Sequence, residues 1–127
     1  MRILLFVAGG GGAGALLRYL VSGLGQRLTV GVFPLGTLLV NVLGCFLIGY
    51  LGAVFSGPLL VRDEVRLALL VGLLGGFTTF SSFGWETFSL LNDREWGFAI
   101  ANVVGSNLLG LLAVWIGYRL AEQWPGV

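Results

Sequence analysis

Four long apolar runs constrain the fold of this chain more than any other feature. They cover residues 3–24, 34–55, 65–91 and 96–121, and only short connectors separate them. A helix of roughly 20 apolar residues is long enough to cross a bilayer. Only 10% of the residues are charged, whereas soluble domains carry about 25%. We therefore expect an all-α membrane protein with four transmembrane helices, formed as a single domain by residues 1–127.

The first run contains the glycine-rich stretch GGGGAGA, which admits two interpretations. Gly9, Gly11 and Gly14 match the dinucleotide-binding pattern G-x-G-x-x-G. That pattern requires an acidic residue about 20 positions further on, whereas the first acidic residue of the chain is Asp63. Glycine also lets membrane helices approach each other closely. We therefore expect a packing face on the first helix rather than a nucleotide site.

The scarcity of charged and reactive side chains argues against several classes of function. The net charge is +1 and there is no basic tract, so nucleic acid is not expected as a partner. The chain has no histidine, and Cys45 is its only cysteine. We expect Cys45 to be a small buried hydrophobic residue. A membrane enzyme would need clustered acids, a histidine or a reactive cysteine, so we do not expect an enzyme.

The arginines give only a weak signal for orientation in the membrane. Four helices place both chain ends on one side, which would carry Arg2, Arg62, Arg66 and Arg119. The other side would carry Arg27 and Arg94, with Arg18 one turn inside the membrane. Positive residues normally concentrate on the cytoplasmic side. A chain with so small a bias can insert both ways and pair with its inverted copy, although a single orientation remains the alternative.

Polar side chains gather within three of the four runs. They are Thr37, Asn41, Thr78, Thr79, Ser81, Ser82, Glu86, Thr87, Asn102, Ser106 and Asn107. Polar groups inside a membrane are costly unless they are paired or line a wet path. They either hold helices together, at about 0.6 kcal/mol each, or line a route for a polar solute. The number of them, on three helices, favours the route.

The stretch GGFTTFSSF predicts a break in the third helix. Gly75 and Gly76 have low helix propensity, and the threonine and serine hydroxyls can take over backbone hydrogen bonds. Carbonyl groups freed at such a break can bind a cation. Phe77, Phe80 and Phe83 recur at every third position. Their positive ring edges can favour an anion, and ordinary packing is the alternative for the rings alone.

The same stretch closely resembles the fluoride channel family, Fluc or CrcB, in which a glycine pair precedes T-T-F-S-x-F. The similarity continues through L-L-R-Y in the first run, G-T-L-L-V-N in the second and W-E-T-F after the expected break. The resemblance implies a dual-topology homodimer of antiparallel subunits with two pores and a third helix broken mid-membrane. It also implies a fluoride-selective channel of the cell inner membrane, which exports cytoplasmic fluoride passively and confers fluoride resistance.

The resemblance also implies roles for particular residues. In the family, the two phenylalanines of the motif line the fluoride path, and the second-helix asparagine donates to fluoride or to the rings. The fluoride pathway expected here consists of Asn41, Phe80, Phe83, Ser106, Thr79, Ser82, Glu86 and Thr37. Among these residues, Glu86 is expected near an entrance.

Two further expectations follow from the resemblance. Arg18 would make a vestibule positive, and the backbone carbonyls of Gly75 and Thr78 would hold a structural sodium ion on the two-fold axis. The fourth helix departs from the family pattern, because Gly110 stands where a serine is usual and Asn102 where a tyrosine can occur. Asn107 is a candidate replacement for the missing serine.

Two other functions remain open. A proton-coupled small-solute exporter can also be a four-helix antiparallel dimer, but such exporters depend on a glutamate in the first helix. Here the one acid inside an apolar run is Glu86, in the third. A purely structural assembly subunit would not need the predicted break. Fluoride flux through liposomes would separate these possibilities.

Overall fold

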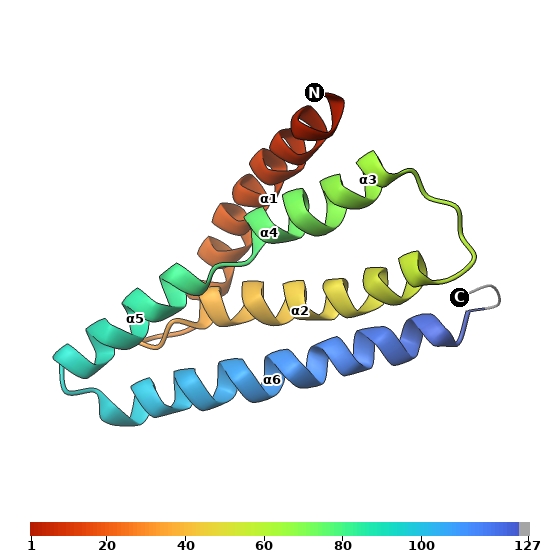
Figure 1. The fold of residues 1–127 in the computed structure, drawn as a ribbon. Helices are drawn as coiled ribbons and strands as arrows, with labels where there is room; N and C mark the ends of the chain where they lie inside the picture. Colours follow the sequence, from red (N-terminus) through yellow and green to blue (C-terminus); the bar gives the residue numbers. More distant parts are fainter. Residues whose placement is uncertain (125–127) are drawn as a thin grey trace.

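Helices account for the architecture of residues 1–124, which are the residues that the computed structural model describes (Figure 1). Four helical segments are long and apolar enough to cross a membrane: α1 (Arg2–Gln26), α2 (Leu35–Ser56), Asp63–Asn92 and α6 (Trp96–Glu122). No strand occurs within this part of the chain. The prediction of an all-α chain with four such helices is therefore confirmed, and each observed segment lies within about two residues of its predicted bounds.

The third segment is not one uniform helix. It consists of α3 (Asp63–Leu67), the π-helix η1 (Ala68–Leu73), α4 (Leu74–Phe77) and α5 (Phe80–Asn92). Between α4 and α5 the backbone of Thr78 and Thr79 is extended, with ψ angles of 159° and 110°. Figure 1 shows the chain crossing from α4 to α5 through this short connection, which we call the Thr78–Thr79 junction.

The first half of this segment packs on α1 through glycines. A Cβ atom on Gly10 would overlap the carbonyl oxygen of Ala68, and one on Gly14 would overlap that of Leu73. In the opposite direction, a Cβ atom on Gly76 would overlap the carbonyl oxygen of Gly11. The two backbones therefore touch, as small residues allow in membrane helices. The glycine packing face expected on the first helix is confirmed, although a Cβ on Gly9 would meet nothing within 4 Å.

Helices α2 and α6 lie side by side in the same manner (Figure 1). A Cβ atom on Gly49 of α2 would overlap the carbonyl oxygen of Val114, and one on Gly117 of α6 would overlap that of Phe46. The two ends of α2 also follow sequence signals, because Pro34 occupies its N-cap and Gly57 its C-cap. Close backbone contact thus fixes both helix pairs.

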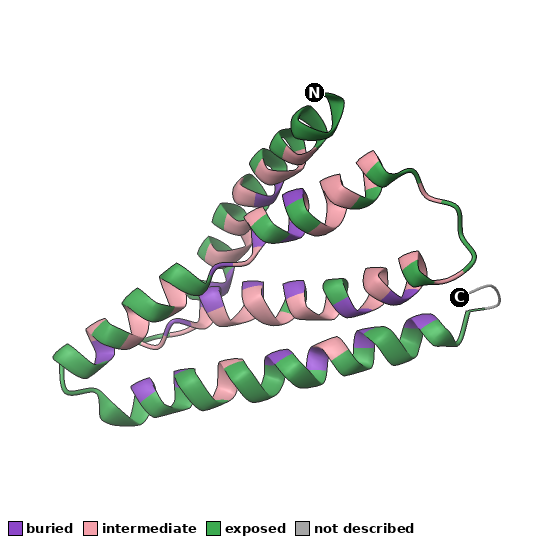
Figure 2. Ribbon diagram, in the orientation of Figure 1, coloured by how far each residue is buried: buried purple, intermediate pink, exposed green. Residues whose placement is uncertain are grey.

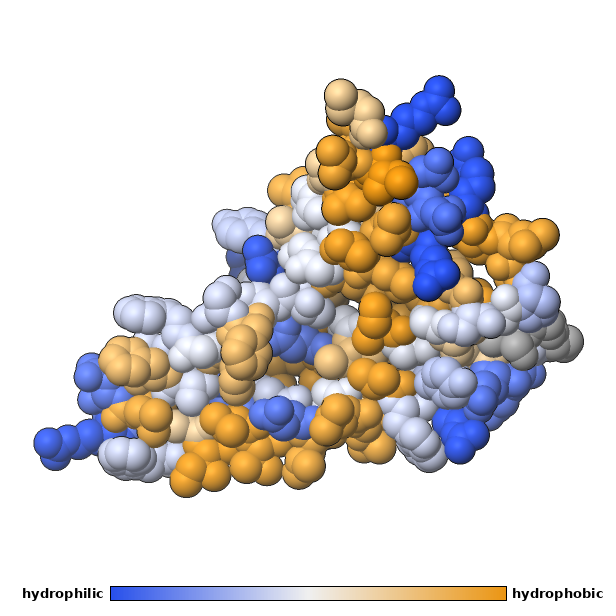
Figure 3. All heavy atoms as spheres, in the orientation of Figure 1, coloured by the Kyte–Doolittle hydropathy of each residue, from blue (hydrophilic) through white to orange (hydrophobic). Residues whose placement is uncertain are grey.

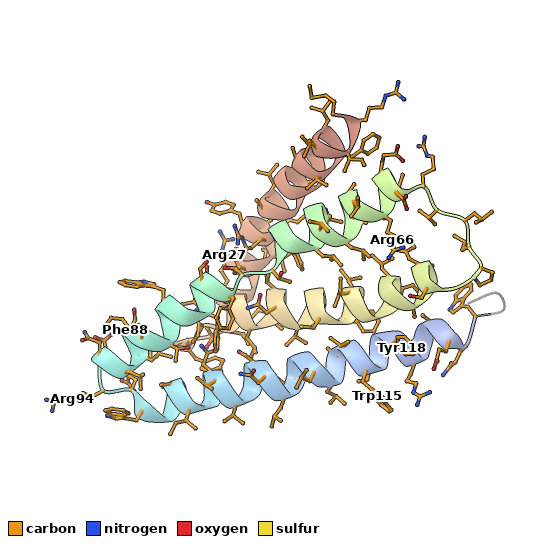
Figure 4. The ribbon with its side chains drawn as sticks, in the orientation of Figure 1. Arg27, Arg66, Phe88, Arg94, Trp115 and Tyr118 are labelled. Atoms are coloured by element: carbon orange, nitrogen blue, oxygen red, sulfur yellow. The ribbon has the colours of Figure 1, made fainter. Side chains whose placement is uncertain are left out.

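Most outward faces of the helices are exposed in a single chain (Figure 2), and much of the visible surface is apolar (Figure 3). The exposed set includes Leu16, Phe80, Leu108, Leu111 and Trp115. Charged residues stand toward segment ends, as Arg94 does at the turn between α5 and α6 (Figure 4). Such a surface needs lipid or another protein to cover it.

Candidate functional site

Asn41 of α2 holds the junction between α4 and α5. Its side-chain amide donates to the carbonyl oxygen of Thr79 over 3.0 Å, and its Oδ1 accepts from the backbone N–H of Thr79 over 2.8 Å. Because the junction is extended, these peptide groups have no helical partners. One side chain thus supplies both hydrogen bonds that the helix would have made at this residue.

Hydroxyl groups complete the two helix ends at the junction. Thr79 is the N-cap of α5, and its Oγ1 accepts from the backbone N–H of Ser82 over 3.1 Å. The same hydroxyl donates to Oγ of Ser82 over 3.0 Å. On the other side, the hydroxyl of Thr78 donates to the carbonyl oxygen of Leu74 over 2.9 Å. Threonine side chains therefore replace backbone hydrogen bonds on both sides, which is the usual chemistry of helix caps.

Two backbone carbonyl groups at the junction are left without a donor. Within residues 1–124, neither the Gly75 nor the Thr78 carbonyl oxygen accepts a hydrogen bond. Gly75 is exposed, and a Cβ atom on it would meet nothing within 4 Å. These oxygens are hard ligands of the kind that alkali and alkaline-earth cations prefer.

A hollow of about 380 Å³ opens beside the junction, and we call it the aromatic hollow. Phe80 and Phe83 lie in its wall with ring centroids 5.5 Å apart and an interplanar angle of 39°. The hollow is lined by Asn41, Gly44, Cys45, Ile48, Leu70, Leu74, Gly75, Thr78, Thr79, Phe80, Phe83, Ser106 and Asn107. It therefore brings together five residues of the predicted fluoride pathway, Asn41, Thr79, Phe80, Phe83 and Ser106, and both predicted sodium ligands, Gly75 and Thr78.

A chain of hydrogen bonds connects α6 to α5 next to this hollow. Ser106 donates to Oδ1 of Asn102 over 3.3 Å, and the amide of Asn102 donates to the hydroxyl of Thr87 over 3.0 Å. Thr87 in turn donates to the carbonyl oxygen of Phe83 over 2.7 Å. Asn102 is only 1% exposed, so the network fastens α6 to the helix that carries both rings.

A second hollow, of about 420 Å³, lies on the α1 side of the junction, and we call it the arginine hollow. Its walls are Ala15, Arg18, Tyr19, Ser22, Thr37, Val40, Thr79, Ser82 and Glu86. Thr37 donates to Oε1 of Glu86 over 2.7 Å. The other carboxyl oxygen of Glu86 is buried and has no partner within the described residues. The four predicted residues absent from the aromatic hollow, Arg18, Thr37, Ser82 and Glu86, are all found here.

Thr79 lines both hollows, so the junction is the wall between them. A third hollow, of about 500 Å³, continues from Thr37 and Glu86 to Gln26 and Arg27 at the end of α1. Arg18 of α1 lines the arginine hollow, and Arg27, the C-cap of α1, lines the third hollow. The hollows together place positive charge at one end and aromatic rings with amides at the other.

Three features of the site were not foreseen from the sequence. Asn41 was predicted to donate to fluoride or to the rings, and in addition its amide makes two hydrogen bonds to the Thr79 backbone that the sequence did not indicate. Gln26 joins the end of α1 to the start of α2, because it donates to the Phe33 carbonyl oxygen over 3.0 Å and accepts from the Gly36 N–H over 3.2 Å. Cys45, expected to be buried, is partly exposed on the wall of the aromatic hollow.

Comparison with known proteins gives a consistent result along nearly the whole chain. Residues 5–118 match the family model described as CrcB-like protein, Camphor Resistance (CrcB). The chain is 48% identical to the fluoride-specific ion channel FluC of Solibacter usitatus, over 94% of this chain and 98% of that protein. It is 45% identical to the FluC protein of Geobacter sulfurreducens, over 97% and 99% of the two chains. The FluC protein of Nitrosococcus oceani is 43% identical over 94% and 95%.

Proposed function

The chain belongs to the CrcB-like protein family, and on that premise we propose that it is a fluoride-selective ion channel of the membrane rather than an enzyme. Relatives of nearly equal length carry the name fluoride-specific ion channel. Four helices that can cross a membrane accord with a multi-pass protein. The channel lets cytoplasmic fluoride leave passively down its electrochemical gradient across the cell inner membrane and so confers resistance to fluoride.

The observation that carries this proposal is the aromatic hollow at the junction. Amide and hydroxyl groups, with two aromatic rings, line a hollow on the surface of an otherwise apolar chain. Fluoride is small and strongly hydrated, so a pore has to replace its water with hydrogen-bond donors. The ring edges of Phe80 and Phe83 add positive potential without a full charge. No binding group is so strong that the ion would be trapped, and conduction requires sites of this modest kind.

In this proposal, the residues of the arginine hollow attract the anion and those of the aromatic hollow bind it as it passes. Arg18, in the arginine hollow, attracts the anion from water, because a cation at the mouth of a low-dielectric cleft raises the local anion concentration. Ser82 and Thr37 provide hydroxyls next to Glu86, close to this entrance. Thr79 adjoins both hollows, so the ion passes the Thr79 peptide on the way to Asn41 and to the rings of Phe80 and Phe83, beside Ser106 in the wall of the aromatic hollow.

Assembly as an antiparallel dual-topology homodimer, with one pore beside each junction, is part of the proposal. A single chain leaves Phe80 84% exposed, although this ring belongs to the site. A second copy in the inverted orientation would cover it and complete the walls of each hollow. The weak arginine asymmetry permits both orientations, and residues 1–127 act as a single channel domain in each subunit. The break of the third helix would then lie near mid-membrane.

A structural sodium ion fits the junction and belongs to the same proposal. The carbonyl oxygens of Gly75 and Thr78 have no donor within the described chain, and Gly75 offers open space for close approach. Two chains on a two-fold axis would present four such oxygens. Carbonyl oxygens of unwound membrane helices bind sodium in transport proteins. The ion would hold the two junctions together by electrostatic attraction and would lie outside the fluoride path.

The activity is tested with purified protein in liposomes loaded with fluoride or chloride, read by an ion-selective electrode. The proposal expects electrogenic fluoride efflux and no chloride efflux. Phe80→Ile and Phe83→Ile keep the bulk of the rings but remove their charge distribution, so at least one of them should abolish or severely slow efflux while the dimer stays intact. Comparable chloride flux would contradict the proposal.

The alternative function, a proton-coupled small-solute exporter, draws support from Glu86. This acid lies within a candidate membrane segment, and one of its oxygens is buried without a partner. An exporter of this kind would move its solute only when a proton gradient is present. Fluoride efflux that continues at equal pH on both sides, with a potassium ionophore to carry the counter-charge, would exclude it.

A further inference from the structure

Asn107 occupies an unusual position in α6. It lies in the middle of a largely apolar helix of 27 residues, and its side chain is exposed in the single chain. A polar group at this depth is tolerated only when it has a partner or borders a wet cavity. Asn107 borders the aromatic hollow, where it faces the same space as Phe80 and Phe83.

The hydroxyl groups of the aromatic hollow already donate their protons within the protein. The acceptors are the Leu74 carbonyl oxygen for Thr78, Ser82 for Thr79 and Asn102 for Ser106. A hydroxyl has a single proton to donate. Each of these residues would have to give up an existing hydrogen bond before it could donate to an ion.

The two amides of the hollow differ from the hydroxyls because each has two N–H donors. Asn41 uses one of them for the Thr79 carbonyl oxygen. Asn107 uses one for the Val103 carbonyl oxygen of its own helix, over 2.7 Å. Within the described chain, the second N–H of each amide has no acceptor. The thiol of Cys45 is only a weak donor, so these two N–H groups are the side-chain donors of the hollow that are available to an anion.

We propose that Asn107 is a fluoride-binding residue of the pathway and that it, rather than Ser106, supplies the α6 donor to the ion. The inference rests on the fluoride channel function proposed above. Val103 fixes the amide by accepting one N–H, which leaves the second N–H for fluoride opposite Asn41. Ser106 instead positions Asn102 and, through Thr87, the α5 helix.

The test compares matched variants by the initial rate of fluoride efflux from liposomes. Asn107→Leu keeps the side-chain size but removes both donors, and it should slow efflux about tenfold or more, as expected for one hydrogen bond to a charged group. Asn107→Gln restores the donors and should recover most of the rate. Ser106→Ala should slow efflux less than about threefold, which corresponds to less than half the free energy of a tenfold change.

The outcomes separate this inference from the proposed function. If the unaltered chain passes no fluoride, the channel function is wrong. If the unaltered chain passes fluoride, and Asn107→Leu remains dimeric and passes it at the same rate, the proposed role of Asn107 is wrong. It is also wrong if Ser106→Ala slows efflux more than Asn107→Leu does.

A second measurement does not depend on the folding of Asn107→Leu. In a Cys45→Ser background, Asn107→Cys should react with a small cationic methanethiosulfonate in liposomes, and fluoride should slow the reaction. Leu108→Cys is the matched control, because Leu108 is on the same helix but does not line the hollow. Its exposed side chain would face lipid in the liposome, where a cationic reagent is scarce, so it should react slowly with or without fluoride. A cysteine at position 107 that is unreactive, or that reacts equally fast with fluoride present, overturns the inference.

Discussion

The two halves of the third segment are held in place by different forces. The half from Asp63 to Phe77 lies against α1, with glycine on glycine and backbone on backbone. The half from Phe80 to Asn92 is held by side-chain hydrogen bonds from α2 and α6. It leaves large aromatic side chains exposed, among them Phe80, Trp85 and Phe88, and Figure 4 shows Phe88 pointing away from the other helices.

The two halves therefore differ in the substitutions that they should tolerate. In the first half, the shape is fixed by atoms of the backbone, which cannot rotate away, so added volume has nowhere to go. In the second half, the shape depends on particular polar partners, and the aromatic face is free for another surface. The first half therefore acts as a scaffold within one chain, and the second half belongs to the site and to the proposed dimer.

The largest effect should come from added volume in the scaffold half. Gly14→Leu places a side chain against the Leu73 carbonyl oxygen and should cost about 3 kcal/mol, the upper end for overpacking. Little folded protein should be recovered in detergent, and its unfolding temperature should fall. Gly12→Leu is the control on the same helix, because a Cβ atom there meets nothing within 4 Å. Equal behaviour of the two variants would show that the backbones are not in contact.

The next effect tests the polar partner of the site half. Asn41→Asp keeps an acceptor for the Thr79 N–H but loses the donor to its carbonyl oxygen. One unsatisfied peptide group should lower stability by about 2 kcal/mol, and the added negative charge should stop fluoride efflux. Asn41→Ala also removes the acceptor of the Thr79 N–H, so hydrogen exchange at the Thr79 amide should become faster in that variant. Thr37→Val, one turn earlier on α2, should leave that exchange rate unchanged, and a slow Thr79 amide in Asn41→Ala would count against the assigned pairing.

A third effect concerns the surface that a single chain leaves open. In Gly75→Leu the added Cβ atom meets nothing within 4 Å of its own chain, so the fold of the subunit should survive. If two junctions meet on an axis, the new side chain should keep them apart and raise the dimer dissociation constant about tenfold or more, equivalent to about 1.4 kcal/mol. Energy transfer between fluorescently labelled subunits in the same liposomes, measured at a series of protein-to-lipid ratios, would give this constant. An unchanged constant would remove the junction from the proposed interface.

The smallest effect should come from the cap of α5. Thr79→Ala removes the acceptor for the Ser82 N–H, and loss of an N-cap typically costs about 1 kcal/mol. Thr79→Ser keeps the hydroxyl and should retain most of that stability. Denaturant titration in detergent would give both values. If the serine and alanine variants lose stability equally, the methyl group of Thr79 rather than its hydroxyl stabilises the junction.

Much of the site could be predicted from the sequence, because its members share unusual chemistry. Hydroxyls, amides and a carboxyl within apolar runs are conspicuous wherever they occur. The eight residues of the predicted fluoride pathway, together with Arg18, Gly75 and Thr78, all line one or both of two adjoining hollows. What they bind remains a prediction. The assignment of individual partners was less accessible: Asn41 pairs with Thr79, 38 residues away, and no local pattern specifies such a pair.

The sequence by itself determined the number and the limits of the helical segments, because bilayer length, apolar runs and terminal residues such as Pro34 and Gly57 are local properties. Only the tertiary structure decided which glycines touch another backbone, that Ala68–Leu73 forms a π-helix, and which donors of the aromatic hollow remain free. The reason is physical. A hydrogen bond or a close contact joins atoms from distant parts of the chain, and each donor that finds a partner in this way is no longer available to an ion.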